Sequence, residues 1–167
     1  MLVTQSLWLN APPRLAFDVG VDCEAWPGLG IPCLREARIA RPEDREGRRA
    51  IAWVWRACGI TLRFVEEQHL DRAHLRVSTV AHELPCLRGY AVHVTYGRDG
   101  AGTLMQLRAE FEIMGGGLFV ESVMAPVAEK SVADTLHAIK RHAEARALWA
   151  APPSGAAMAT GTGGRGY

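Results

Sequence analysis

The sequence carries little net charge and has no long apolar run. Its 167 residues have a formal net charge of +1 with 22% charged residues, and it shows neither a basic run nor basic residues interleaved with aromatic ones. This argues against a nucleic-acid-binding protein. No stretch of about 18 apolar residues occurs, and the first residues lack a basic segment followed by an apolar one. We therefore expect a cytoplasmic protein that binds neither nucleic acid nor a membrane.

Cysteine pairs that could bind metal or form a redox centre are also absent. Cys23, Cys33, Cys58 and Cys86 show no Cys-x-x-Cys spacing, and no histidine pairs match them. Neither a zinc site nor a redox pair is indicated. We expect reduced thiols, no metal and no cofactor.

The length suits one domain, because single cores are usually built from about 150 residues. From Ala150 onward the composition changes to Ala, Pro, Gly, Ser and Thr, which bury too little apolar area to fold. The sequence therefore predicts one domain over residues 1–149 and a disordered tail over residues 150–167.

Between residues 34 and 113 apolar and polar side chains alternate with the period of a β-strand. The predicted strand segments are Leu34–Ile39, Ala50–Ala57, Ile60–Leu70, Leu75–Ala81, Gly89–Tyr96 and Thr103–Phe111. Short turns such as Cys58-Gly59 and Asp99-Gly100 join them, so we expect antiparallel hairpins with one dry and one wet face.

The expected register follows from three pairs: Ala57 opposite Ile60, Leu70 opposite Leu75, and Tyr96 opposite Thr103. It places one set of side chains on the dry face: Trp53, Trp55, Leu62, Phe64, Glu66, Gln68, Val77, Thr79, Val92, Val94, Met105, Leu107 and Ala109. A second, mostly charged set falls on the wet face.

A dry sheet face has to be covered, and the long helical candidate is Pro126–Trp149. Proline is common in the first turn of a helix, so we expect the helix to begin at Pro126. Its apolar stripe is Val132, Leu136, Ile139 and Ala143, and a second stripe of Val127, Ser131, Asp134 and Ala138 is apolar except at its centre. Polar groups facing a space between helix and sheet would indicate a ligand pocket.

The N-terminal portion predicts a strand over Val3–Leu9, a short helix over Pro12–Val19 capped by Asn10, and a helical turn over Asp22–Leu29. Within it, the segments 7–12, 16–19 and 21–27 resemble the opening signature of the polyketide cyclase/dehydrase family, a branch of the START-like, helix-grip superfamily. The resemblance runs from about Val3 to Arg146.

The resemblance implies an α+β fold: a seven-stranded antiparallel sheet wrapped around a long C-terminal helix, with two short N-terminal helices. It further implies an aromatase/cyclase of aromatic polyketide, hence antibiotic, biosynthesis, which guides ring closure and dehydration of a poly-β-ketone held by an acyl carrier protein. That family commonly uses an arginine on the central strand, and some members add a histidine on the last strand and an aspartate on the final helix. The aspartate matches Asp134, whereas the other two positions fall on Gln68 and Ala109.

Because this alignment leaves no fixed cation, the predicted chemistry rests on neutral donors and carboxyl groups. Enolate stabilisation would come from Gln68 and Tyr90, or from Arg35 if it lies opposite Trp55 and points inward. A buried Glu66 would have a raised pKa and serve as acid or base. The predicted catalytic residues are Asp134, Glu66 and Gln68, and the predicted substrate-binding residues are Trp53, Trp55, Phe64, Arg35, Tyr90, Val92, Met105, Leu107 and Ser131.

Other interpretations stay open at this point. The inward tryptophans could be part of the hydrophobic core. Arg45, Arg48 and Arg49 are typical of a solvated basic turn. The three consecutive glycines at residues 115–117 are typical of a hinge. The alternative function is a non-catalytic carrier for a hydrophobic small molecule such as a polyketide, lipid or quinone. A third class is a partner-binding protein of the same superfamily.

Overall fold

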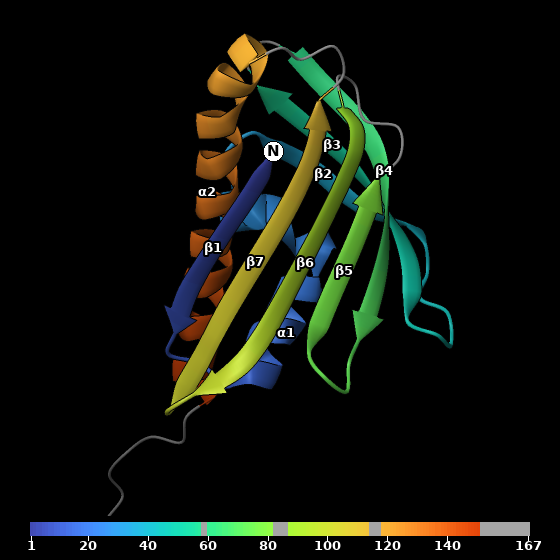
Figure 1. The fold of residues 1–167 in the computed structure, drawn as a ribbon. Helices are drawn as coiled ribbons and strands as arrows, with labels where there is room; N and C mark the ends of the chain where they lie inside the picture. The colour runs from blue at the N-terminus through green and yellow to red at the C-terminus, as the bar shows by residue number, and fades with distance from the viewer. Residues whose placement is uncertain (58–59, 82–86, 114–117, 151–167) are drawn as a thin grey trace, which may run out of the picture.

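The computed structural model describes residues 1–57, 60–81, 87–113 and 118–150. Its strands are β1 (Leu2–Leu9), β2 (Leu34–Arg41), β3 (Arg48–Ala57), β4 (Ile60–Asp71), β5 (Arg76–Ala81), β6 (Leu87–Asp99) and β7 (Gly102–Ile113). Its helices are α1 (Pro13–Val21), the 3-10 helix η1 (Cys23–Leu29) and α2 (Leu118–Ala150). The strands form one 7-stranded antiparallel sheet in the order β1-β7-β6-β5-β4-β3-β2. Both α-helices lie on the same side of this sheet (Figure 1). The predicted seven-stranded, helix-covered fold is confirmed.

The register between β4 and β5 and between β6 and β7 differs from the expected one, yet the side chains of these strands lie on the predicted faces. Ala57 pairs with Ile60 as expected. Leu70, however, lies opposite Val77 rather than Leu75, and Tyr96 lies opposite Met105 rather than Thr103. Each error is a shift of two residues, which keeps every side chain on its own face of the pleated sheet.

The helices begin at other residues than the sequence predicts. α2 begins at Leu118 and so contains Pro126 in its interior, which makes the predicted first-turn position of this proline wrong. Pro126 is exposed, and an interior proline costs a helix one backbone hydrogen bond. The N-cap of α1 is Pro12 and not Asn10. The Asn10 backbone N–H donates to Glu144 Oε1 of α2 at 2.8 Å.

Two apolar clusters fill the space between the helices and the sheet. In the first, α1 packs against β6 and β7, and the rings of Phe17 and Tyr96 meet edge to face with centroids 5.7 Å apart. The second joins η1, β2 and β3 to Ala138 of α2. The predicted apolar stripe of the helix is buried at Leu136 and Ile139. α2 therefore bridges the two clusters.

Some predictions concern residues outside those that the structure describes. They are the turn at residues 58–59, the glycine hinge at residues 115–117 and, from residue 151 onward, the tail. In the described part of the chain, no helix is long and apolar enough to cross a membrane.

Candidate functional site

A row of side chains crosses the inner face of the sheet from β3 to β7. Its members pair in register across neighbouring strands: Arg49, Gln68, Thr79, Val92 and Ala109. The first three are polar, yet only 6%, 6% and 4% of their surfaces are exposed. Buried polar groups are costly unless they are hydrogen-bonded, so this row is a candidate for a functional site.

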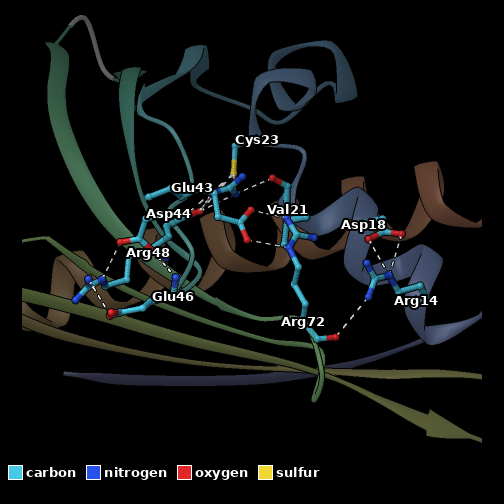
Figure 2. A network of polar contacts seen from close by, with 11 residues as sticks. Arg14, Asp18, Val21, Cys23, Glu43, Asp44, Glu46, Arg48 and Arg72 are labelled. Atoms are coloured by element: carbon cyan, nitrogen blue, oxygen red, sulfur yellow. Dashed lines mark hydrogen bonds and ion pairs between the residues drawn. The ribbon is translucent and has the colours of Figure 1, made fainter.

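Arg49 is held by partners from two sides of the interior. Its Nε and Nη2 donate to Gln68 Oε1 at 2.9 and 2.8 Å. Nη2 also donates to the Val21 carbonyl at 2.6 Å and lies 3.3 Å from Cys23 Sγ. Figure 2 shows Val21 and Cys23 of this network beside a surface ion pair, in which Arg72 donates to Glu43. Among the described residues no carboxylate forms an ion pair with Arg49.

Cys23 adds no reactive thiolate to this network. Burial raises the pKa of its thiol to about 12, and the nearby Arg49 charge lowers it by less. The thiol is therefore protonated at neutral pH, and thiolates rather than thiols are nucleophilic. Cys23 acts here as a weak hydrogen-bonding partner.

The buried arginine corrects two sequence expectations. Arg49 belongs to β3 and points inward, so its assignment to a solvated turn is wrong, and so is the conclusion that no cation faces the interior. The pattern Arg49-Ile51-Trp53-Trp55 continues the inward period of β3 and is the signal that could have found it. Arg35, by contrast, is exposed. The residue opposite Trp55 is Leu34, and the pairing of β2 with β3 shifts register after it.

Glu66 lies on the same strand as Gln68, two residues away, and is 5% exposed. Burial raises the pKa of its carboxyl to about 7. The Trp53 indole, the Gln68 amide and the Tyr90 hydroxyl lie close enough to oppose that rise. At neutral pH Glu66 is thus present in both protonation states, which is the condition that favours general acid–base chemistry.

Tyr90 reaches Glu66 from two strands away. Ala81 of β5 pairs with Tyr90 of β6, and the register of β4 and β5 continues from the Glu67–Val80 pair toward Glu66 and Ala81. This register places the small Ala81 between Tyr90 and Glu66. Burial, and then the Glu66 charge, raise the pKa of Tyr90 well above its ordinary value, so its hydroxyl remains a proton donor.

Tryptophans form one wall beside Glu66. The ring centroids of Trp26 and Trp53 are 5.4 Å apart, and those of Trp53 and Trp55 are 6.5 Å apart. Phe64, the cross-strand partner of Trp53, is half-buried beside them. In the part of the chain that the structure describes, the buried indole N–H groups of Trp26, Trp53 and Trp55 have no hydrogen-bond partner.

The predicted residues of α2 lie apart from this cluster. Asp134 is half-buried, and its carboxylate accepts hydrogen bonds from Lys130 Nζ at 3.1 and 2.9 Å. Ser131 is half-buried, and its carbonyl accepts a bond from Thr135 Oγ1 at 2.9 Å. Three other predicted residues are packed into the first apolar cluster: Val92, Met105 and Leu107. The structure thus groups Glu66, Gln68 and Tyr90 but not Asp134.

Hollows in the described part of the chain include one at the end of the sheet and one beside Tyr96. The larger, of about 710 Å³, lies at one end of the sheet, and its lining includes Ala81, Tyr90 and Phe111. The other, of about 360 Å³, borders Tyr96 and Arg98. The lining of the larger hollow also includes Val80, Arg108 and Glu110, which are exposed on the outer face of the sheet. The pocket expected beneath α2 stays a prediction.

Together, the curved antiparallel sheet, the long covering helix and the inward polar row define a helix-grip protein with an interior polar site. The chain belongs to the polyketide cyclase/dehydrase and lipid transport family, whose family model matches residues 2–144. The family and the fold expected from the sequence are both confirmed.

Solved structures with the same fold include proteins of several kinds. The Zhui aromatase/cyclase from Streptomyces sp. R1128 is 18% identical with a TM-score of 0.78, over 87% of this chain and 94% of that one. The protein TTHA0849 from Thermus thermophilus is 20% identical with a TM-score of 0.71, over 91% and 100% of the two chains. A START superfamily protein from Mycobacterium smegmatis is 16% identical with a TM-score of 0.65, over 89% and 97%. At these identities the likeness shows the fold alone. No curated protein matches the chain significantly in sequence.

Proposed function

We propose that the protein is an aromatase/cyclase of aromatic polyketide biosynthesis. It would fold a carrier-bound poly-β-ketone inside the fold and promote regiospecific aldol cyclisation and dehydration, in the cytoplasm. One observation carries the proposal: a buried carboxyl with a pKa of about 7, Glu66, lies among polar donors, and one of these donors, Gln68, is bound to a buried guanidinium. The family and the aromatase/cyclase fold neighbours support the same class.

The chemistry needs a base, a donor and an acid. The Glu66 carboxylate takes a proton from a methylene between two ketones, and the resulting enolate carbon bonds to a carbonyl carbon further along the chain. The new alkoxide takes up a proton to give an alcohol. Loss of a second α-proton to the base, with release of the hydroxyl as water after protonation, then forms the double bond. A carboxyl group that titrates near neutral pH can both accept a proton as a base and donate one as an acid.

The buried cation supports these steps through Gln68. Arg49 binds Oε1 of Gln68 through Nε and Nη2, which fixes the amide so that its NH₂ group faces away from the guanidinium. The amide can then donate to an enolate oxygen or to Glu66, while the Arg49 charge polarises it. Hydrogen bonds that are assisted by a charge are about twice as strong as neutral ones, and fixed donors contribute more in a water-excluded site.

Asp134 is the second proposed proton-transfer group. It precedes the buried Ala138 by one helical turn, on the side of α2 that faces the second apolar cluster. To act, its carboxylate must leave Lys130, whose side chain is exposed. A surface ion pair is worth about 0–1 kcal/mol, so the main cost of this rearrangement is the transfer of the carboxylate from water toward the interior.

The test is turnover and product profile in a reconstituted synthase with its carrier protein. Glu66→Gln keeps the shape of the side chain and should lower turnover by about a hundredfold or more. The matched control is Glu67→Gln, the next residue of β4, whose side chain is exposed and paired with Arg41. Thermal melting would verify that each variant is folded.

Asp134→Asn is the companion variant and should also lower turnover. If Asp134→Asn leaves turnover unchanged, Asp134 is not a catalytic residue and Glu66 is the single proton-transfer group of the proposal. A wild-type product profile in both Glu66→Gln and Asp134→Asn would contradict the cyclase proposal.

The second candidate function is a non-catalytic carrier for a hydrophobic polyketide, lipid or quinone. It is favoured by Gln68 and Ala109, which stand where the family often has arginine and histidine. A carrier predicts that Glu66→Gln changes ligand affinity by about 1 kcal/mol through one hydrogen bond. Product distribution in the synthase would then be unaffected.

A further inference from the structure

A hollow lies on the outer face of the sheet, near the turn between β4 and β5. Arg76, Thr95 and Gln106 lie side by side on β5, β6 and β7. Their chain neighbours pack into the first apolar cluster, so alternation turns these three side chains away from α1 and α2 (Figure 1). The hollow has a volume of about 360 Å³. It is here called the outer hollow, and its lining includes His74, Arg76, Thr95, Gly97, Arg98 and Gln106.

The outer hollow carries positive charge without a matching acid. Arg76 and Arg98 both line it, whereas no carboxylate of the described residues does. Neither arginine forms an ion pair within the described part of the chain. Asp71 is the cross-strand partner of Arg76, but its carboxylate accepts from the His74 backbone N–H at 3.0 Å and lies 2.8 Å from the Nδ1 atom of that ring. Two guanidinium groups that lack an acid favour an anion at the hollow.

The β4–β5 turn holds a strained residue beside the outer hollow. Leu75 has a φ of 52°, in the left-handed region that glycine and asparagine usually occupy. Its side chain packs against the first apolar cluster, while its neighbours His74 and Arg76 are exposed at the hollow. Strained residues of this kind cluster at ligand-binding sites. The turn thus accepts an unfavourable conformation that presents a histidine and an arginine to the hollow.

Gly97 keeps the outer hollow open. Among the described residues, a Cβ added there would have one heavy atom within 4 Å, the Leu104 carbonyl oxygen at 4.0 Å. The packing around Gly97 therefore leaves room for a side chain, and a large one would occupy the hollow. The Thr95 hydroxyl and the Gln106 amide at its lining can both donate hydrogen bonds. Neutral donors thus accompany the two guanidinium groups.

We propose that the outer hollow binds a phosphate group, carried by a small soluble compound or by a lipid headgroup. The planar fork of an arginine matches two phosphate oxygens at once. A phosphate group has three strong acceptor oxygens, enough to meet two such forks and a neutral donor together, whereas a carboxylate has two. The inference goes beyond the proposed function and does not depend on it, because the outer hollow and Glu66 lie on opposite faces of the sheet.

The experiment uses the purified full-length chain and two kinds of probe at matched ionic strength. Calorimetry compares inorganic phosphate with acetate. Co-sedimentation compares phosphatidylcholine vesicles with and without phosphatidic acid. Phosphate should bind at least about tenfold more tightly than acetate, because it gains at least one further hydrogen bond to a charged group.

Variants then locate the phosphate. Arg76→Gln and Arg98→Gln each remove one guanidinium group and should weaken phosphate binding about tenfold. Gly97→Leu leaves both charges in place but fills the hollow, and it should weaken binding at least as much. The matched control is Arg63→Gln. Arg63 is exposed on the outer face of β4, has no ion pair with a described residue and lies outside the hollow, so its loss should leave the affinity unchanged.

Each outcome decides for or against the inference. Equal affinities for phosphate and acetate would overturn it, and so would the absence of binding to both phosphate and the acidic vesicles. A loss in Arg63→Gln as large as in Arg76→Gln, or no loss in Arg76→Gln and Arg98→Gln, would overturn it too. Both arginine variants keep the test decisive if Gly97→Leu fails to fold. Binding of phosphate in solution would identify a soluble ligand, and binding to acidic vesicles alone a lipid headgroup. Glu66→Gln should leave phosphate affinity unchanged, so this inference and the cyclase proposal can fail separately.

Discussion

Glu66 makes the stability of the protein depend on pH in a direction that the structure predicts. Burial raises the pKa of this carboxyl from its ordinary 4.5 to about 7, so the folded chain holds the proton more tightly than the unfolded chain does. The resulting stabilisation is fully present below pH 4.5 and is lost as the pH rises through 7. One pKa unit corresponds to about 1.4 kcal/mol, so the whole effect is about 3 kcal/mol.

Urea unfolding of the wild type and of Glu66→Gln, from about pH 5 to about pH 8.5, measures this effect. Glutamine keeps the shape but does not titrate. The difference between the two free energies of unfolding cancels the other titrating groups. Across this range the free energy of unfolding of the variant should rise by about 2–3 kcal/mol relative to that of the wild type.

Glu67→Gln controls for the loss of a carboxyl group from the same strand, because its side chain is exposed. It should not reproduce the large relative gain. A difference between the wild type and Glu66→Gln that stays constant with pH would refute the reasoning. A change in the opposite direction would mean that the interior stabilises the carboxylate, and Glu66 would then be a poor general acid.

Three further predictions concern packing and the tail. A Cβ added at Gly20 would lie 1.9 Å from the Tyr96 hydroxyl oxygen, so Gly20→Ala should lower the free energy of unfolding in urea by about 1–3 kcal/mol, although alanine is the better helix former. Adding Tyr96→Phe should recover part of this loss, and no recovery would mean that the clash lies elsewhere. Arg49→Met leaves buried acceptors without their donor and should lower the free energy of unfolding by about 1–3 kcal/mol in the same assay. Arg48→Met, at an exposed position, should lower it much less, and equal losses would contradict the inward placement of Arg49. Truncation after Ala150 should leave the melting temperature nearly unchanged, and a large drop would show that the tail is docked.

The sequence predicts the two faces of the sheet well, because the face on which a side chain lies depends only on whether its position along the strand is odd or even. The expected pairings at Leu70 and Tyr96 are each wrong by two residues, and no side chain changes face as a result. Turn length, which sets the exact register, depends on where each strand actually ends. β6 and β7 extend past Tyr96 and Thr103 to the turn beyond Asp99.

Side-chain partners are harder to read from the sequence than faces. Asp134 has the position in the helix expected of a pocket residue, but its carboxylate is hydrogen-bonded to Lys130, which lies one turn earlier on the same surface. The alternation of apolar and polar residues in the sequence does not show whether a side chain such as Asp134 pairs with a neighbour on its own helix or points into the interior. Likewise, the contact between Tyr90 and Glu66 depends on the small Ala81 between them, which only the three-strand register brings there.

Arg49 changes what Gln68 means for function. Judged by position alone, glutamine at the place of a family arginine argues for a protein that binds without catalysing. Gln68 pairs in register with Arg49 on the adjacent strand, and its oxygen accepts both of the Arg49 donors that face it. The cation is therefore displaced by one strand and linked through the amide. A polarised amide is a weaker donor than a guanidinium, but it carries no net charge and so leaves the nearby Glu66 free to titrate near neutrality. An arginine directly beside Glu66 would lower the pKa of that carboxyl and weaken it as an acid.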